Sequence, residues 1–270
     1  VFTAARRDPA VDEQAVQVFR AGAIVANAQW RFDQHAEDVR AQRNLHVQQG
    51  REAAAGEFLA HRAEAFTPGR FVENDELDAR QVADDALLEL HIRHVPGGFF
   101  TDQLFTQFKG REILRIEGPL GSFCLREESD KPMIFVAGGT GFAPIKAMIE
   151  HALHHGVDRP MVLYWGVRSK KDLYLPDLPG RWQQANPGFT FIPVLSDPLP
   201  DDAWPGRTGF VHRAVMDDFP DLSGYQVYAC GAPPMIDAAR RDFAAECHLP
   251  AAEFFADSFT YAAEADARKG

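Results

Sequence analysis

Residues 133–144 have the sequence MIFVAGGTGFAP, the most informative segment for the architecture of the chain. Its apolar start predicts a short buried strand over Met133–Ala137, and the pattern beyond predicts a helix over Pro144–His155. The small residues between them let backbone N–H groups approach a phosphate at the start of that helix. An ordinary turn could share this composition, but its place between strand and helix favours binding. The candidate phosphate-binding residues are Gly138, Gly139, Thr140, Gly141 and Pro144.

Strand and helix patterns alternate through the rest of the chain. The further expected strands are Met161–Val167, Phe189–Leu195, Gln226–Cys230 and Glu253–Ser258. The expected helices between them are Leu178–Ala185, Arg213–Phe219 and Pro234–Cys247. Five strands joined through helices predict an α/β fold with a doubly wound, parallel five-stranded sheet. Such sheets bind ligands at the carboxyl ends of their strands, where the Gly-rich turn lies.

The chain just before this sheet is expected to form strands and turns of another kind. A strand is expected over Leu87–His94, a short helix over Phe100–Phe108, and a second strand over Ile113–Glu117. The turn Gly118–Gly121 is expected to end that second strand.

Residues 1–85 differ in composition from everything that follows. They contain no Lys, Ser, Met or Tyr, which marks a shift in composition. Their pattern is weakly helical over Ala15–Ala26 and Ala36–Ala65. We interpret 1–85 either as a helical or disordered segment with a role of its own, or as a wrongly framed or spliced gene model joined to a genuine protein near Ala86. The expected division of the chain is therefore 1–85, 86–129 and 130–270.

Charge and cysteine content exclude several function classes. A net charge of -11 disfavours nucleic acids and anionic membranes, because phosphates are held by clustered Lys and Arg. No apolar run is long enough to span a bilayer, and the start lacks the order of a secretory signal. The three cysteines, Cys124, Cys230 and Cys247, are scattered and odd in number, which predicts a reducing, cytoplasmic location and no iron–sulfur cluster. No metal site is expected, because His151, His154 and His155 are more typical of a solvated helix.

Three ordered motifs resemble a known family. They are Gly138–Pro144, Tyr164–Ser169 and Cys230–Met235, and they are similar to the NAD(P)-binding half of ferredoxin-NADP reductase-like flavoproteins. Within that family they look most like oxygenase reductase components and CDP-6-deoxy-glucoseen reductases. The resemblance covers about residues 87–261 and implies that a partial antiparallel β-barrel flavin domain precedes the nucleotide-binding sheet.

The resemblance implies where a pyridine nucleotide would bind. The turn Gly139–Gly141 would wrap its pyrophosphate, and Arg168 and Ser169 would face its ribose. Cys230 and Gly231 would lie beside the nicotinamide, although a buried structural role for this cysteine is the alternative. The choice between NADH and NADPH stays open, with a lean to NADH because an acid, Asp197, follows the third strand.

The resemblance also implies a flavin site. Candidate FAD contacts are Gly97, Gly98, Thr101, Gly118, Pro119, Gly121 and Phe123, with ordinary turns as the alternative. Thr101 is placed to cap the helix that follows. Phe259 is expected either to lie against the isoalloxazine ring or to be ordinary core. The family's Arg-x-Tyr-Ser segment is missing before Leu87, which indicates an incomplete flavin site.

The function implied is that of an NAD(P)H-dependent flavoprotein reductase. Electrons would pass from NAD(P)H through FAD to an acceptor such as an iron–sulfur protein or an oxygenase, with Cys230 and Phe259 beside the reacting rings. One alternative is a truncated dinucleotide-binding domain that catalyses nothing. Another is that residues 1–85 form a partner-binding module that regulates a reductase.

Overall fold

A computed structural model describes residues 3–4, 16–22, 29–32, 87–107, 116–120 and 122–259 of the chain. Its main feature is a parallel sheet of six strands in the order β11-β10-β6-β7-β8-β9. These strands are β6 (Met133–Gly138), β7 (Met161–Val167), β8 (Phe189–Leu195), β9 (Arg207–Thr208), β10 (Gln226–Gly231) and β11 (Phe254–Ser258). The expected doubly wound α/β fold is confirmed. The sixth strand, β9, was missed because two residues are too few to carry a pattern.

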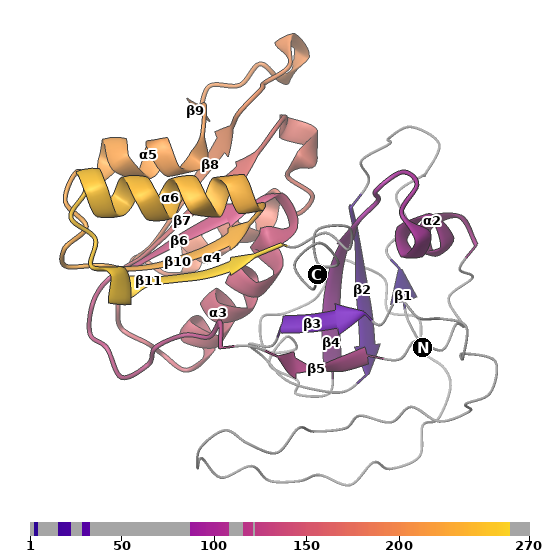
Figure 1. The fold of residues 1–270 in the computed structure, drawn as a ribbon, viewed down its shortest axis with the longest axis horizontal. Helices are drawn as coiled ribbons and strands as arrows, with labels where there is room; N and C mark the ends of the chain where they lie inside the picture. Colours follow the sequence, from indigo (N-terminus) through magenta and orange to yellow (C-terminus); the bar gives the residue numbers. More distant parts are fainter. Residues whose placement is uncertain are drawn as a thin grey trace, which may run out of the picture.

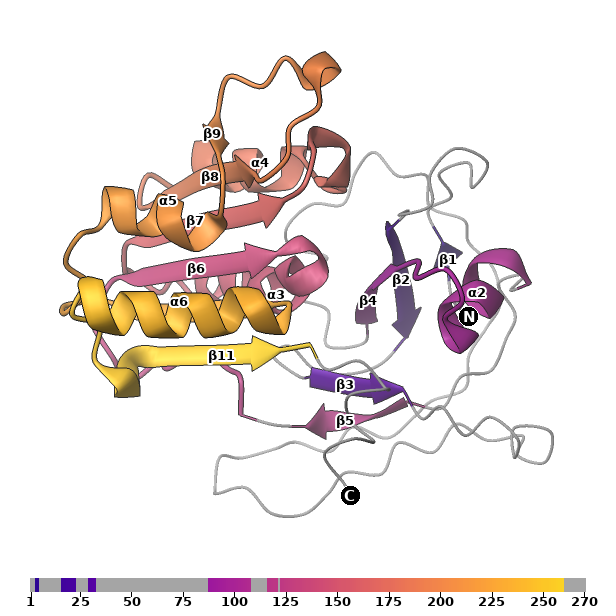
Figure 2. The ribbon, with the colours of Figure 1, turned by 45° about the horizontal axis from the view of Figure 1, so that its top comes forward.

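Helices cover both faces of this sheet, as Figures 1 and 2 show. One face packs against α3 (Phe142–His154) and α4 (Asp177–Ala185), and the other against α5 (Val211–Asp218) and α6 (Pro233–Glu246). The central strand β6 is buried on both sides, which explains its unbroken apolar sequence. Short 3-10 turns complete this region: η2 (Gly139–Gly141), η3 (Lys170–Asp172), η4 (Pro200–Asp202) and η5 (Ala251–Glu253).

A second group of strands lies beyond the carboxyl ends of the parallel strands (Figure 2). Strands β1 (Thr3–Ala4), β2 (Val16–Gly22) and β4 (Leu87–Arg93) form one antiparallel sheet. Strands β3 (Gln29–Phe32) and β5 (Ile116–Leu120) form an antiparallel pair, and α2 (Phe99–Thr106) follows β4. We call these elements the flavin-side sheets, after the flavin domain that the resemblance implies for this part of the chain.

Two sequence-based expectations are wrong in this region. The helix expected over Ala15–Ala26 is replaced by β2, because all seven residues of β2 pair with β4 and long-range pairing overrides weak local preference. The turn expected at Gly118–Gly121 is also wrong, since Gly118 and Pro119 lie inside β5, where β3 supplies the pairing partner. The expected helix Ala36–Ala65 and residue Gly121 lie outside the described residues.

None of the helices in the described part of the chain combines the length and hydropathy that crossing a membrane requires.

Candidate functional site

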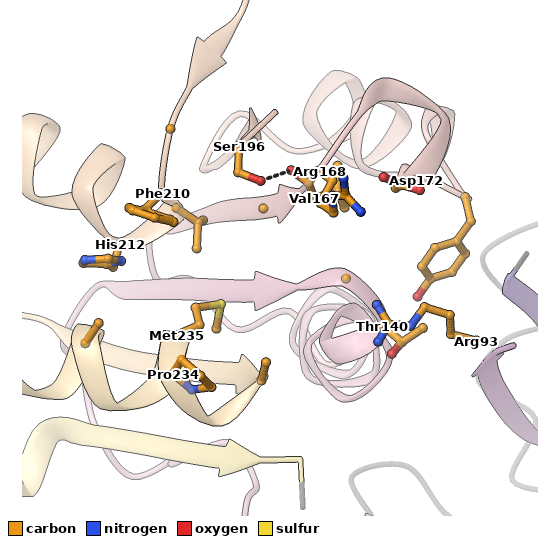
Figure 3. A pocket seen from close by; sticks show the side chains of 17 residues that line it. Arg93, Thr140, Val167, Arg168, Asp172, Ser196, Phe210, His212, Pro234 and Met235 are labelled. Atoms are coloured by element: carbon orange, nitrogen blue, oxygen red, sulfur yellow. Dashed lines mark hydrogen bonds between the residues drawn. The ribbon is translucent and has the colours of Figure 1, made fainter. Parts of the chain in front are cut away.

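A cavity of about 450 Å³ opens at the carboxyl ends of the parallel strands (Figure 3). Its walls come from the turn after β6, the end of β7, the segments around η3 and before α5, and the start of α6. Arg93, at the end of β4, lines the cavity from the flavin-side sheets, and Figure 3 shows this side chain beside Thr140. Of the residues expected in the site, Gly139, Thr140 and Arg168 line this cavity.

The Gly-rich turn is held in shape before any ligand arrives. Gly139 has a φ of +54°, a conformation that favours glycine. Its carbonyl accepts a hydrogen bond of 3.0 Å from Trp165 Nε1, and the Trp165 ring stacks on Phe142 at 4.0 Å. A Cβ on Gly141 would lie 2.1 Å from the carbonyl oxygen of Cys230. The turn thus brings backbone N–H groups to the start of α3, the arrangement that binds a pyrophosphate.

Two more of the expected glycines let the strand ends and α6 approach one another. A Cβ on Gly138 would lie 2.6 Å from Met235 Sδ, and one on Gly231 would lie 2.8 Å from Met235 Cε. Met235 itself lines the cavity, so these two glycines shape the site indirectly, by leaving room for the Met235 side chain. Pro144 stands in the first turn of α3, where its missing N–H costs no helix hydrogen bond.

Arg168 and Ser169 are neighbours in sequence but differ in exposure and in their contacts. The Arg168 guanidinium lies 3.5 Å from Asp197 Oδ2, and both side chains are exposed, so this ion pair leaves Arg168 available to a ligand. Ser169 is buried, and both its backbone N–H and its hydroxyl donate to Asp172 Oδ2 at 3.0 Å. Ser169 therefore shapes the η3 turn and is not among the residues lining the cavity.

Cys230, Gly231 and Phe259 lie together at the end of β10. The Cys230 thiol is fully buried and lies 3.9 Å from Asp257 Oδ2, and the Phe259 N–H donates to the Gly231 carbonyl at 3.0 Å. Burial, followed by the charge of Asp257, raises the pKa of Cys230 well above its ordinary value. The thiol is thus protonated at neutral pH and is no nucleophile.

The residues expected to contact FAD are only partly described. The expectation that Thr101 caps α2 is wrong, because its hydroxyl donates to the Val95 carbonyl at 2.9 Å. The N-cap is Gly98, and it makes no side-chain capping bond. Gly97 has a φ of +79°, and its N–H donates to Asp102 Oδ2 at 3.0 Å. Phe123 is buried in the core that contains α3. Gly118 and Pro119 lie in β5.

Pattern reading missed an aromatic pair at the edge of the cavity. Phe210 is 70% exposed, and its ring stacks on His212 at 6.0 Å. His212 Nε2 lies 3.3 Å from Asp242 Oδ2, and burial lowers the pKa of His212 despite that carboxylate. An aromatic residue directly after Gly209, before a helix, was the available signal.

Two further lining residues, Arg93 and Tyr174, were not expected in this cavity. Their distance in sequence from the Gly-rich turn hid them, although the polar alternation along β4 was a signal for Arg93. Within the described residues, no group of His, Cys, Asp and Glu side chains is arranged to hold a metal ion.

The fold and the cavity define an α/β dinucleotide-binding domain, whose ligand lies at the carboxyl ends of parallel strands. Residues 135–241 match the family model described as the oxidoreductase NAD-binding domain. The resemblance to ferredoxin-reductase-like flavoproteins expected from the sequence is confirmed.

Individual relatives agree with this assignment. Protein RfbI of Salmonella typhimurium is 47% identical over 174 residues, which cover 64% of this chain and 51% of that protein. The CDP-6-deoxy-L-threo-D-glycero-4-hexulose-3-dehydrase reductase of Yersinia pestis is 44% identical over 172 residues, covering 64% of this chain and 51% of that protein. The chain thus spans about half the length of these curated relatives. In the crystal structure of the Amycolatopsis cytochrome P450 reductase GcoB, the similar region covers 96% of this chain and 70% of that chain, with a TM-score of 0.68 at 27% identity.

Proposed function

We propose that this chain is an NAD(P)H-dependent flavoprotein reductase that passes electrons through FAD to a protein acceptor. The observation that carries the proposal is the position of the cavity, between the Gly-rich turn of the NAD-binding domain and Arg93 of the flavin-side sheets. A dinucleotide held there would have one end directed toward β4. The names of the relatives support the reaction class, because they are reductases.

The cavity suggests how the dinucleotide would lie. The Gly139–Gly141 turn would hold the pyrophosphate through backbone N–H groups, and Gly141 lets this turn pack against the Cys230 carbonyl, where a Cβ would clash. The exposed ring of Phe210 would stack on the adenine, since a flat apolar side chain at a cavity edge suits a base. Asp197, beside Arg168, would repel a 2′-phosphate, which favours NADH over NADPH.

The flavin would lie on the other side of Arg93. The Gly97–Gly98 turn before α2 fits a flavin pyrophosphate by position, although one of its N–H groups is already bonded to Asp102. Bound FAD would supply the acceptor for a hydride and the donor of single electrons. Cys230 and Phe259 would lie beside the reacting rings, where the small neutral thiol would leave space for the nicotinamide.

We also infer how the chain is divided and where it works. Residues 86–129 would belong to the flavin domain and 130–270 to the nucleotide domain, and β2 supports a contribution of residues 1–85 to the flavin domain. The acceptor would be a separate iron–sulfur, dehydrase or oxygenase protein, the kinds of system named for the relatives. Three free cysteines support a cytoplasmic location.

The visible absorption spectrum tests the proposal. The purified chain is incubated with FAD, desalted, and then mixed anaerobically with NADH. We expect retained yellow colour that bleaches on NADH addition. A chain that binds NADH but emerges colourless would be a dinucleotide-binding domain without reductase activity, and the proposed function would be wrong.

A further inference from the structure

A hydrogen-bond network of polar side chains connects β4 to the wall of the cavity. Glu89, His91 and Arg93 alternate along β4 and so share one face of the strand. His91 Nδ1 lies 2.6 Å from the Tyr174 hydroxyl, and His91 Nε2 lies 2.7 Å from Glu89 Oε1. The same carboxylate oxygen lies 2.9 Å from Lys146 Nζ on α3. These contacts join one strand of the flavin-side sheets to two segments of the NAD-binding domain.

The protonation of Lys146 and Tyr174 follows from burial and from the neighbouring carboxylates. Burial alone would lower the pKa of Lys146, but the carboxylates of Glu150, at 2.7 Å, and Glu89 outweigh it and raise that pKa above its ordinary value. The His91 side chain is 1% exposed, and its Nε2 faces the Glu89 carboxylate, which can only accept, so Nε2 is the donor of that hydrogen bond. Burial, followed by the charge of Glu89, raises the pKa of Tyr174 well above its ordinary value, so its hydroxyl keeps its proton and is able to hydrogen-bond His91 Nδ1.

The ring of Tyr174 connects this hydrogen-bond network to the phosphate-binding turn. It meets the Trp165 ring edge-on, with centroids 5.2 Å apart, and lies 6.2 Å from the ring of Phe142. Trp165 in turn holds the Gly139 carbonyl through its indole N–H. Tyr174 therefore contacts β4 through its hydroxyl and supports the Gly-rich turn through its ring, while it lines the cavity between them.

We propose that Tyr174 is a positioning residue that couples the dinucleotide cavity to β4. Through His91 and Glu89 it fixes β4, and with it Arg93, at a set distance from the Gly-rich turn. Dinucleotide binding in the cavity is then transmitted along β4. The inference rests on the proposed function, since the two cofactors would be held by different elements and hydride transfer is sensitive to small changes in their separation.

The first test compares Tyr174→Phe with Tyr228→Phe in the FAD-loaded chain, by anaerobic stopped-flow reduction with NADH. Tyr228 is a matched control, because its buried hydroxyl donates to Gln226 at 2.9 Å near the start of β10, and Tyr228 does not line the cavity. We expect Tyr174→Phe to leave the Kd for NADH within about twofold of the wild type. The limiting rate of flavin reduction should fall about tenfold in Tyr174→Phe alone. Equal limiting rates in the wild type and Tyr174→Phe would overturn the proposal.

A second test does not depend on flavin. Amide hydrogen exchange over Leu87–Arg93 is measured with and without NADH. We expect NADH to slow amide exchange over Leu87–Arg93 in the wild type and in Tyr228→Phe. In Tyr174→Phe, NADH should leave this exchange unchanged. If the wild-type chain binds NADH but retains no FAD, the proposed function fails while this measurement still decides the coupling. A β4 that responds to NADH equally in all three proteins would contradict it.

The variant His91→Phe gives a check on the connection. If Tyr174 acts through His91, the variant His91→Phe and the double variant with Tyr174→Phe should both lose the NADH effect on β4 to the same extent as Tyr174→Phe. A purely structural role for Tyr174 would instead lower the unfolding temperature without changing the response of β4 to NADH.

Discussion

Phe210 shows how one side chain can reveal a binding surface. Among the described residues it is the most exposed large apolar side chain, at 70%, and it stands at the edge of a cavity. Leu199 is also exposed, at 48%, but it does not line the cavity. Single exposed apolar side chains are common on protein surfaces, but ligand cavities are lined mainly by apolar and aromatic side chains, so an exposed ring at a cavity edge is placed to contact a ligand. Comparing the two residues separates ligand contact from simple surface apolarity.

Replacing Phe210 by Ala should weaken NADH binding. Loss of stacking on a base predicts a roughly tenfold higher Kd. Fluorescence titration with NADH measures it, and Leu199→Ala is the control that should bind as the wild type does. An unchanged Kd for NADH in Phe210→Ala would contradict the proposed position of the adenine at this edge of the cavity.

The protonated state of Cys230 predicts its reactivity. Because its pKa is raised, alkylation by iodoacetamide should be very slow at pH 7 and should become faster only as the pH rises above the ordinary thiol range. Cys124 is partly exposed and serves as the internal control in the same sample. Peptide mass spectrometry reads both sites. Rapid labelling of Cys230 at pH 7 in the folded chain would contradict the buried position described for it.

Elements of the parallel sheet could largely be predicted from sequence, and those of the flavin-side sheets could not. Strands such as β6 are short apolar runs followed by turns and helices, so local pattern is sufficient. Strand β2 forms because β4, far along the chain, supplies its partner. The same holds for Gly118 and Pro119 in β5, whose partner is β3. Pairing between distant segments leaves little trace in either segment alone.

Two glycines in different elements should respond oppositely to alanine. Gly141→Ala places a methyl group against the Cys230 carbonyl and should destabilise the chain by about 1–3 kcal/mol. Gly180 lies inside α4 with open space around it, so Gly180→Ala should stabilise by about 0.5–1 kcal/mol through helix propensity. Thermal unfolding of both variants measures the difference. Equal effects would mean that the turn yields to a methyl group.

In the assembled chain, the cavity is lined in part by side chains that no single sequence motif predicts. The Gly-rich turn and Arg168 could be predicted, because strand-turn-helix patterns carry them. Arg93 and Tyr174 reach the same cavity from a different sheet and from the segment after η3. Their place follows from how the flavin-side sheets face the parallel sheet, which is a property of the assembled chain (Figure 2).

Disrupting β2 should therefore abolish FAD binding and leave NADH binding intact. Val18 pairs with His91, and Val18→Pro removes a backbone donor from β2. We expect this variant to lose FAD on desalting while it still binds NADH, because the parallel sheet does not include β2. Val18→Ala keeps the backbone N–H and should retain FAD. Full flavin retention in Val18→Pro would show that FAD binding does not require β2.

The rigid Gly-rich turn has a consequence for the entropy of binding. Trp165 and the close backbone contact at Gly141 order this loop when the chain folds. A ligand that arrives later need not restrict the loop, so the entropy penalty of binding is small and most contact energy remains as affinity. Calorimetry of NADH binding should accordingly show a heat capacity change that reflects apolar burial alone, without the added contribution of a loop that folds around its ligand.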